Sequence, residues 1–168
     1  MSRAVLLDAG PVIHLDELGR LDLFKCFEEV LIPSEVWTES IRHRRDLRLS
    51  DIPNALLLDP APRPSPRLRH HFERFDLDEG ESAALSWLEL FGDGTLVSDD
   101  GDARDAAEQL SFRVVGTLGL IIKASKNGLI SLGEARGLFD RIKPETSLHA
   151  SVGLLSELKA MLLEGNTK

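Results

Sequence analysis

Residues 3–13, RAVLLDAGPVI, decide the architecture that the rest of the chain is expected to complete. The apolar run from Arg3 to Leu7 predicts a buried strand, which stops at Asp8. Pro11 suits the first turn of a helix, so we expect a helix to begin there. The run is far shorter than the roughly 20 apolar residues that span a membrane, and it does not have the pattern of a signal peptide.

The same alternation of a short apolar run and a helical pattern continues along the chain. Further strands are expected at about 30–32, 56–58, 95–98 and 113–115. Further helices are expected at about 20–27, from Ser34 as N-cap, and at about 67–75, 79–91, 102–110, 116–127, 131–142 and 147–163. Short apolar strands that alternate with helices predict an α/β fold, with a parallel sheet covered on both faces.

The composition of the chain indicates one globular domain over residues 1–168. Cys26 is its one cysteine, which excludes an internal disulfide and indicates a reducing compartment, the cytoplasm. The net charge is −8, but residues 42–74 carry 8 of the 20 Lys and Arg and only 4 acids. This basic arm could bind a polyanion locally, and a solvated proline-rich surface is the alternative.

Carboxylates follow two of the predicted strands. Asp8 ends the first strand, and the pair Asp99-Asp100 ends the strand at 95–98. Ligands of parallel sheets bind beyond the carboxyl ends of the strands, so these acids are candidate site residues. Asp8 has an alternative role as a cap on the following helix. We expect Asp102 to cap the helix after the pair, which leaves the pair itself without a capping role.

Glu81 and Glu39 are further candidates because both lie near the inner face of a predicted helix. Glu81 precedes the apolar residues of its helix by three, four and seven positions, which places it on the buried face. A core-facing glutamate is costly unless it is paired or bound to a cation. The alternatives are that Glu81 only favours the helix dipole and that Glu39 is an ordinary solvent-exposed residue.

Several carboxylates that face one small space repel one another, and some would have to take up protons. A divalent cation removes this conflict, and Mg²⁺ or Mn²⁺ is the natural occupant of a site with oxygen ligands. Such an ion suits phosphate chemistry, because it polarises a phosphoryl oxygen and lowers the pKa of water. A dehalogenase-like phosphatase is disfavoured, since it needs an aspartate where this chain has Gly10. A response-regulator receiver is disfavoured because its acidic pair comes early in the chain.

Four motifs, in order, resemble those of PIN domains. They are LLDAGPVI at 6–13, IPSEVWTE at 32–39, DEGESAA at 78–84 and VSDD at 97–100. The stretch VVGTLGL at 114–120 is similar to a prokaryotic branch of that family related to the toxins of toxin–antitoxin systems. The resemblance covers about residues 3–132, and the C-terminal helices at about 131–163 follow it.

The resemblance implies a three-layer α/β/α sandwich with a Mg²⁺- or Mn²⁺-dependent endoribonuclease site. By position it implies the catalytic residues Asp8, Glu39, Glu81 and Asp100, the metal ligands Asp8, Glu81 and Asp100 with Asp99 as a further candidate, and Ser98 as a supporting hydrogen-bond donor. Strand alternation places Asp99 and Asp100 on opposite sides, and the hydroxyl-x-Asp spacing favours Asp100. We therefore expect Asp8, Glu81 and Asp100 to converge on one ion and Asp99 to point away.

The substrate implied by the resemblance is RNA, cut by a metal-activated water. Arginines of the basic arm would contact its phosphates without reading its sequence. They are Arg42, Arg44, Arg45, Arg67 and Arg69. The expected partners are an antitoxin protein and a second copy in a homodimer, with no membrane. The alternative function is a catalytically inactive PIN fold that binds RNA or protein.

Overall fold

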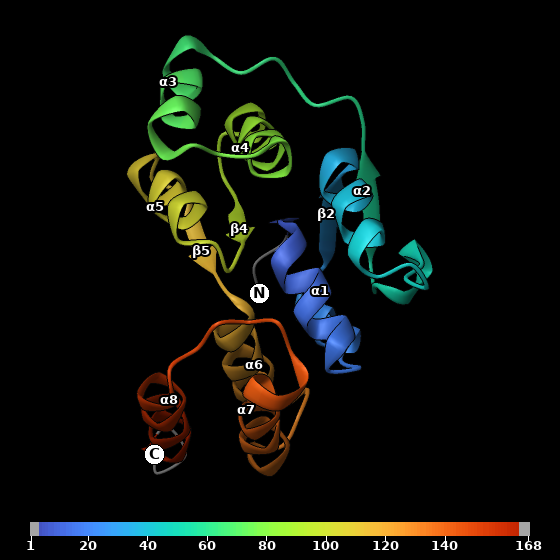
Figure 1. Ribbon diagram of the computed structural model, residues 1–168, viewed down its shortest axis with the longest axis vertical. Coiled ribbons are helices and arrows are strands. Elements are labelled where there is room, and N and C mark those ends of the chain that lie inside the picture. The colour runs from blue at the N-terminus through green and yellow to red at the C-terminus, as the bar shows by residue number, and fades with distance from the viewer. Residues whose placement is uncertain (1–3, 165–168) are drawn as a thin grey trace.

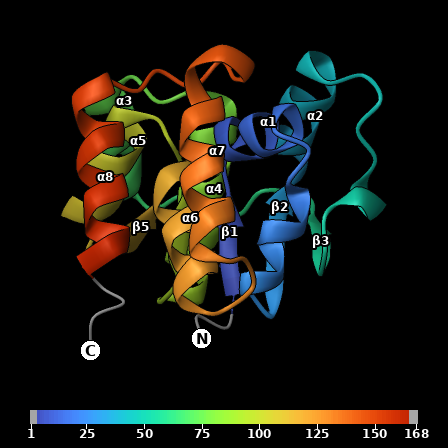
Figure 2. The same cartoon turned by 90° about the horizontal axis from the view of Figure 1, so that it is seen from below.

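The computed structural model describes residues 4–164, and its sheet has five parallel strands in the order β3-β2-β1-β4-β5. The strands are β1 (Ala4–Leu7), β2 (Glu29–Pro33), β3 (Ala55–Leu58), β4 (Thr95–Val97) and β5 (Arg113–Val115). Helices cover both faces of the sheet (Figures 1 and 2), which confirms the predicted α/β/α sandwich. Arg3, where the first strand is predicted to begin, lies outside the described residues.

Eight α-helices and two short 3₁₀-helices connect these strands within residues 4–164. The α-helices are α1 (Ala9–Glu17), α2 (Ser34–His43), α3 (Pro66–Phe75), α4 (Glu79–Phe91), α5 (Gly101–Gln109), α6 (Thr117–Lys126), α7 (Leu132–Glu145) and α8 (Val152–Glu164). The 3₁₀-helices are η1 (Leu21–Cys26) and η2 (Leu49–Asp51). None of the helices in this described range is long and apolar enough to cross a membrane.

Side chains of alternate residues in β1 pack into two separate hydrophobic cores. Val5 and Leu7 belong to a core built with α1, α2, α6, α7 and α8, whereas Leu6 belongs to a core built with α3, α4 and α5. Figure 2 shows α6, α7 and α8 on one side of the sheet and α3, α4 and α5 on the other. All three side chains are at most 1% exposed. A strand that is buried on both faces has to be apolar throughout, which explains why polar chemistry begins only at Asp8, one residue beyond the strand.

The last helix begins later than predicted. α8 starts at Val152, whereas the sequence pattern predicts a start at 147. Ser151 Oγ accepts a hydrogen bond from the backbone N–H of Leu154 at 3.1 Å and so caps this helix. Upstream, the N–H of Ser147 donates to Glu17 Oε2 at 2.8 Å, which ties the chain to the end of α1. Residues 146–151 therefore form a non-helical connector between α7 and α8.

The start of α2 also differs from the prediction. Pro33 occupies the N-cap position, and Ser34 is the first residue of the helix. The Ser34 hydroxyl donates to Asp59 Oδ1 at 2.7 Å instead of accepting a bond from the helix backbone. A tertiary partner has replaced the local cap that the residue type favours.

Truncation of a side chain between α4 and the sheet tests the packing of this layer. Leu85 is fully buried, so Leu85→Ala should lower the free energy of unfolding by about 2–5 kcal/mol through lost burial and a cavity. Leu90, in the same helix, is 62% exposed, and Leu90→Ala should change it by no more than about 0.5 kcal/mol. Urea denaturation of the two variants measures both values, and equal losses would contradict the assigned layer.

Candidate active site

The carboxyl ends of the two central strands meet at Asp8 and Ser98. Leu7 pairs with Val97 in parallel register, and Ser98 Oγ donates to Asp8 Oδ2 at 2.7 Å. The N–H of Ala9 donates to Asp8 Oδ1 at 2.7 Å, so the predicted helix cap is confirmed. Asp8 is 5% exposed, and burial raises its pKa to about 6 in spite of these two hydrogen bonds. The cap leaves Asp8 at the sheet edge where the site is predicted.

Glu81 enters the same region from the first turn of α4. The side chain is 9% exposed, in agreement with the predicted inward orientation. Its Oε2 accepts the N–H of Asp78 at 2.9 Å, and Asp78 Oδ1 accepts the N–H of Glu81 at 2.8 Å, which completes a capping box. Burial raises the pKa of Glu81 to about 8, although the hydrogen bond from the Asp78 N–H acts to lower it. The negative charges of Asp78, Asp8 and Asp100 add to the rise.

Asp99 is held by hydrogen bonds from two different helices. His14 Nδ1 of α1 lies 2.7 Å from Asp99 Oδ2, and the N–H and hydroxyl of Thr117 donate to Asp99 at 2.7 and 2.5 Å. Burial acts to raise the pKa of Asp99, but the bonds from His14 and Thr117 outweigh it and hold the pKa below its usual range. Both carboxylate oxygens of Asp99 therefore have hydrogen-bond partners, which hold the side chain against α1 and α6.

Asp100 caps the helix that follows it, which corrects the expectation that Asp102 would do so. Asp100 Oδ1 accepts the N–H of Ala103 at 2.9 Å, and the N–H of Asp100 donates to Ser98 Oγ at 3.1 Å. The helix begins at Gly101, one residue earlier than predicted, because Asp100 already supplies the cap.

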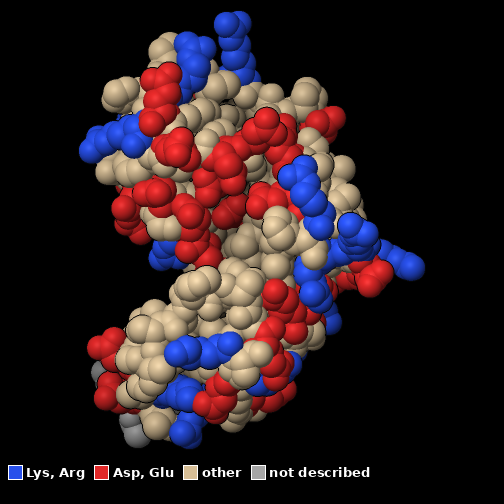
Figure 3. Space-filling model, viewed as in Figure 1, with Lys and Arg blue, Asp and Glu red and all other residues tan. Residues whose placement is uncertain are grey.

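One cavity of about 340 Å³ collects the acidic residues singled out from the sequence. Its walls include Asp8, Glu39, Glu81, Asp99 and Asp100. The expectation that Asp99 points away is therefore wrong in part, since its side chain lines this acidic cavity while its oxygens face α1 and α6. Burial, together with the negative charge of Asp78, raises the pKa of Glu39. In Figure 3, acidic side chains gather across the upper part of the face drawn.

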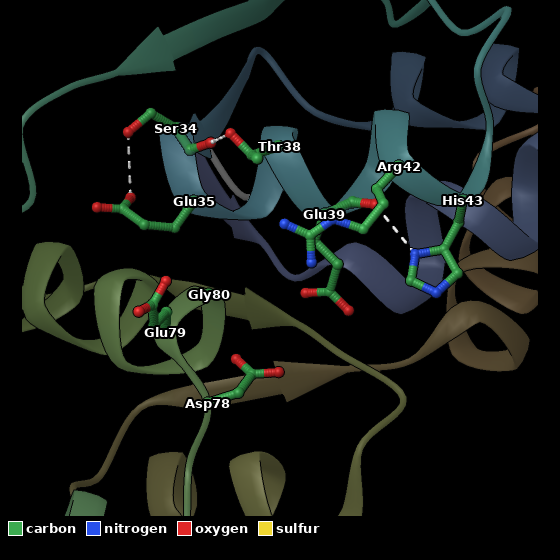
Figure 4. A pocket seen from close by; sticks show the side chains of 9 residues that line it. All are labelled: Ser34, Glu35, Thr38, Glu39, Arg42, His43, Asp78, Glu79 and Gly80. Carbon is green, nitrogen blue, oxygen red and sulfur yellow. Dashed lines mark hydrogen bonds between the residues drawn. The ribbon is translucent and has the colours of Figure 1, made fainter.

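The predicted arginines do not gather in the same way. Arg42 lines a neighbouring cavity of about 390 Å³ between α2 and the start of α4 (Figure 4), which shares Glu39 and Asp78 with the acidic cavity. Arg44 is already paired with Asp16 at 2.5 Å. Three more are exposed, Arg45 after α2 and both Arg67 and Arg69 on α3, which lies well apart from α2 in Figures 1 and 2. Of the five, Arg42 is the one whose side chain lines a cavity joined to the acidic one.

Several residues that line the acidic cavity are not predicted as site residues from the sequence. The spacing Asp78-x-x-Glu81 is the signal that could have identified Asp78 as a capping residue. His14 is expected to be a surface or packed histidine, and it is packed, with Asp99 as its partner. Ser147, Leu148 and His149 of the α7–α8 connector also line the cavity. No local signal marks these three, because their position depends on the contact between the connector and α1.

The chemistry of the cavity fits a hard divalent cation, although its geometry is wider than expected. No three His, Cys, Asp or Glu side chains within residues 4–164 lie close enough together to hold one ion. The predicted convergence of Asp8, Glu81 and Asp100 is therefore not met, because each carboxylate accepts a backbone N–H at a helix start. The donor set still consists of oxygens alone, and the raised pKa values of Asp8 and Glu81 reflect a site that a cation would stabilise.

Comparison of the sequence with models of protein families supports the same fold. The model of a PIN-domain family matches residues 4–163, nearly the whole chain. The chain belongs to the PIN-domain family. PIN domains are generally nucleases and typically use divalent metals, which agrees with an acidic cavity at the carboxyl edge of the sheet. A comparison with curated proteins gives no match.

The raised pKa of Glu81 predicts a specific dependence of stability on pH. In the folded protein the carboxyl holds its proton up to about pH 8, whereas its ordinary pKa is 4.5. Ionisation therefore destabilises the PIN fold as pH rises through this window. Relative to wild type, Glu81→Gln should be neutral below pH 4.5 and more stable above pH 8, by on the order of 2 kcal/mol after allowance for solvent screening.

Urea denaturation across this pH range measures the difference. Glu79→Gln is the matched control, since it removes a charge from an exposed position in the same helical turn. Parallel pH profiles for wild type and Glu81→Gln would contradict the assignment of a buried, raised carboxyl.

Proposed function

We propose that this PIN domain is an endoribonuclease that hydrolyses phosphodiester bonds with Mg²⁺ or Mn²⁺. The observation that carries the proposal is the gathering of acids from four separate chain segments into one cavity at the sheet edge. Asp8, Glu81 and Asp100, which line this cavity, would hold the ion. When bound, the ion supplies Lewis acidity that activates water and stabilises negative charge on the phosphate.

The chain's own residues would divide the remaining work. Ser98 orients the carboxylate of Asp8 through its hydrogen bond, and His14 and Thr117 hold Asp99 beside it. Glu39 lies at the rim, half-buried, where its carboxylate can accept a proton from an attacking water. Cleavage would leave a 5′-phosphate and a 3′-hydroxyl, as the family motifs imply.

The setting proposed for this activity is a toxin–antitoxin pair in the cytoplasm. The motifs similar to the toxin branch of the family support it, and an antitoxin protein would then mask the cavity. A homodimer is the assembly we propose, supported by exposed apolar side chains on α8 such as Val152, Met161 and Leu163. RNA is the proposed substrate, and Arg42 is the best placed of the five arginines that the sequence predicts to contact it.

A second candidate function is a PIN fold that binds RNA or protein without cleaving it. The observation that favours it is the absence, within residues 4–164, of three ligand side chains close enough to share one ion. Calorimetry with Mn²⁺ separates the two functions, since a binding module does not require the metal. Saturable binding that Asp8→Asn abolishes supports the nuclease, and no binding supports the module.

Loss of one acid from the cavity should abolish cleavage. Asp8→Asn should reduce the rate at which single-stranded RNA is cut in Mn²⁺ by at least about 100-fold, because it removes a ligand charge. Asp105→Asn, an exposed acid in α5, is the matched control and should leave the rate unchanged. Gel analysis of labelled RNA gives both rates and the product ends. Equal rates for the two variants would contradict the assigned site.

Charge next to the cavity should govern RNA affinity. Arg42→Ala should weaken binding of single-stranded RNA several-fold and reduce the slope of log K against log salt by about 0.7, the value for one contact to a single-strand phosphate. Arg136→Ala removes an exposed charge from α7 and should leave both quantities unchanged. Fluorescence anisotropy at several salt concentrations measures them, and an unchanged slope for Arg42→Ala would exclude it from the RNA path.

A further inference from the structure

A second, largely apolar groove opens beside the acidic cavity, and the proposed function does not use it. This β5–α8 groove has a volume of about 440 Å³, within the roughly 300–1,000 Å³ of small-ligand pockets. Its aliphatic side chains come from β5, α6, α8 and the connector between α7 and α8, and they are Val114, Val115, Leu118, Leu148, Leu154 and Leu158. The surface is hollowed at the left of Figure 3, between the regions that Figure 1 labels α5 and α8.

The β5–α8 groove is continuous with the acidic cavity. Asp99, Leu148 and His149 line both hollows, so a ligand can extend from one to the other without leaving the surface. The α7–α8 connector that carries Leu148 and His149 forms the shared wall, and it is anchored to α1 by the bond from Ser147 to Glu17. Part of a substrate bound in the acidic cavity would therefore lie next to these aliphatic walls.

Arg104 places a positive charge in the wall of the groove. Its Nη1 donates to the carbonyl oxygen of Ser98 at 3.0 Å, which holds the guanidinium beside the acidic cavity. Within residues 4–164 it forms no ion pair with a carboxylate inside 4.0 Å, so its remaining N–H groups can serve a ligand. Gly116 permits this placement, because a Cβ there would lie 2.9 Å from Arg104 Nη1 and 2.7 Å from Asp99 Oδ1.

An arginine next to an apolar groove, both adjoining a phosphodiester-cleaving site, matches the chemistry of a nucleotide. We propose that the β5–α8 groove binds the base of a nucleotide beside the scissile phosphate of single-stranded RNA, with Arg104 on the phosphate of that nucleotide. The inference rests on the proposed function for the identity of the substrate. A base in a duplex is stacked and paired, so only an unpaired strand or loop can place a base there.

The walls also indicate what kind of recognition the groove performs. Six aliphatic side chains offer apolar contact and no hydrogen-bond pattern that distinguishes one base from another. Affinity should therefore depend on the presence of a base at this position more than on its identity. Base-edge readout would need convergent donors and acceptors. Of the polar side chains in the groove, Asp99 is already bonded to His14 and Thr117, and Arg104 is assigned to the phosphate, which leaves His149 alone.

Binding of single-stranded RNA hexamers that carry one abasic position tests this proposal. The full chain is used with Asp8→Asn, so that binding is read without cleavage, by fluorescence anisotropy. One abasic position should weaken binding by roughly tenfold, the effect of losing apolar contact on the scale of one buried side chain. Leu154→Asp, at a position 42% exposed, should weaken binding of the intact hexamer similarly and remove the penalty for the abasic position.

Two further variants complete the test. Arg104→Gln should weaken the intact and abasic hexamers by the same factor, because it acts on the phosphate. Ala160→Asp is the matched control, since Ala160 is exposed on α8 and does not line the groove. It should leave the abasic penalty intact.

Three results would overturn the proposal: no RNA binding, no abasic penalty at any position, or a penalty that survives Leu154→Asp. A change of oligomeric state in Leu154→Asp with RNA binding intact would also overturn it and assign the groove to a second copy of the chain. Failure of the proposed function is distinguishable, because it appears as wild-type protein that binds RNA in Mn²⁺ without cutting it.

Discussion

The hydrogen bond from Ser98 to Asp8 joins the carboxyl ends of β1 and β4, and the site is arranged around it. The parallel register of these strands, with Leu7 beside Val97, brings together residues that are 90 positions apart in the chain. Because β1 is apolar on both faces, its first polar side chain, Asp8, emerges only at this edge. Glu81, in the first turn of α4, and Asp100, the N-cap of α5, then join Asp8 at the site.

The same arrangement carries an electrostatic cost. Burial, with neighbouring charges, raises the pKa of Asp8 to about 6 and of Glu81 to about 8, so the cavity resists full ionisation. Bonds from backbone N–H groups at the starts of α1, α4 and α5 offset part of this cost, since a helix start favours negative charge. The capping interactions also hold the three carboxylates apart. A divalent cation bound in the cavity would therefore stabilise the folded protein.

Much of the fold follows from the sequence because the apolar runs are short, separate and regular. Asp8 and Glu81 could be selected for the same reason, since each carboxylate interrupts an apolar pattern. The orientation of Asp99 could not be predicted, because it depends on His14 and Thr117, which reach it from helices distant in the chain. Strand alternation alone placed it away from the cavity that it in fact lines.

The α7–α8 connector and the arginines show the same limit. Helical propensity favours a helix from 147, but the contact of Ser147 with Glu17 holds this segment outside any helix. Clustering in sequence favours a shared role for five arginines, yet Arg44 is paired with Asp16 and Arg67 lies on a different helix from Arg42. Contacts with residues distant in the chain determine where α8 begins and how these arginines are used, and no local sequence pattern predicts such contacts.

The most direct test of the account is to locate a metal in this cavity. Crystals grown with Mn²⁺ and measured at the manganese absorption edge would give its position from anomalous scattering. The account predicts a peak between Asp8, Glu81 and Asp100, at Mn²⁺–oxygen distances of roughly 2.1–2.2 Å, slightly longer than those of the smaller Mg²⁺. A crystal saturated with Mn²⁺ that shows no peak there, or a peak held by other residues, would contradict it.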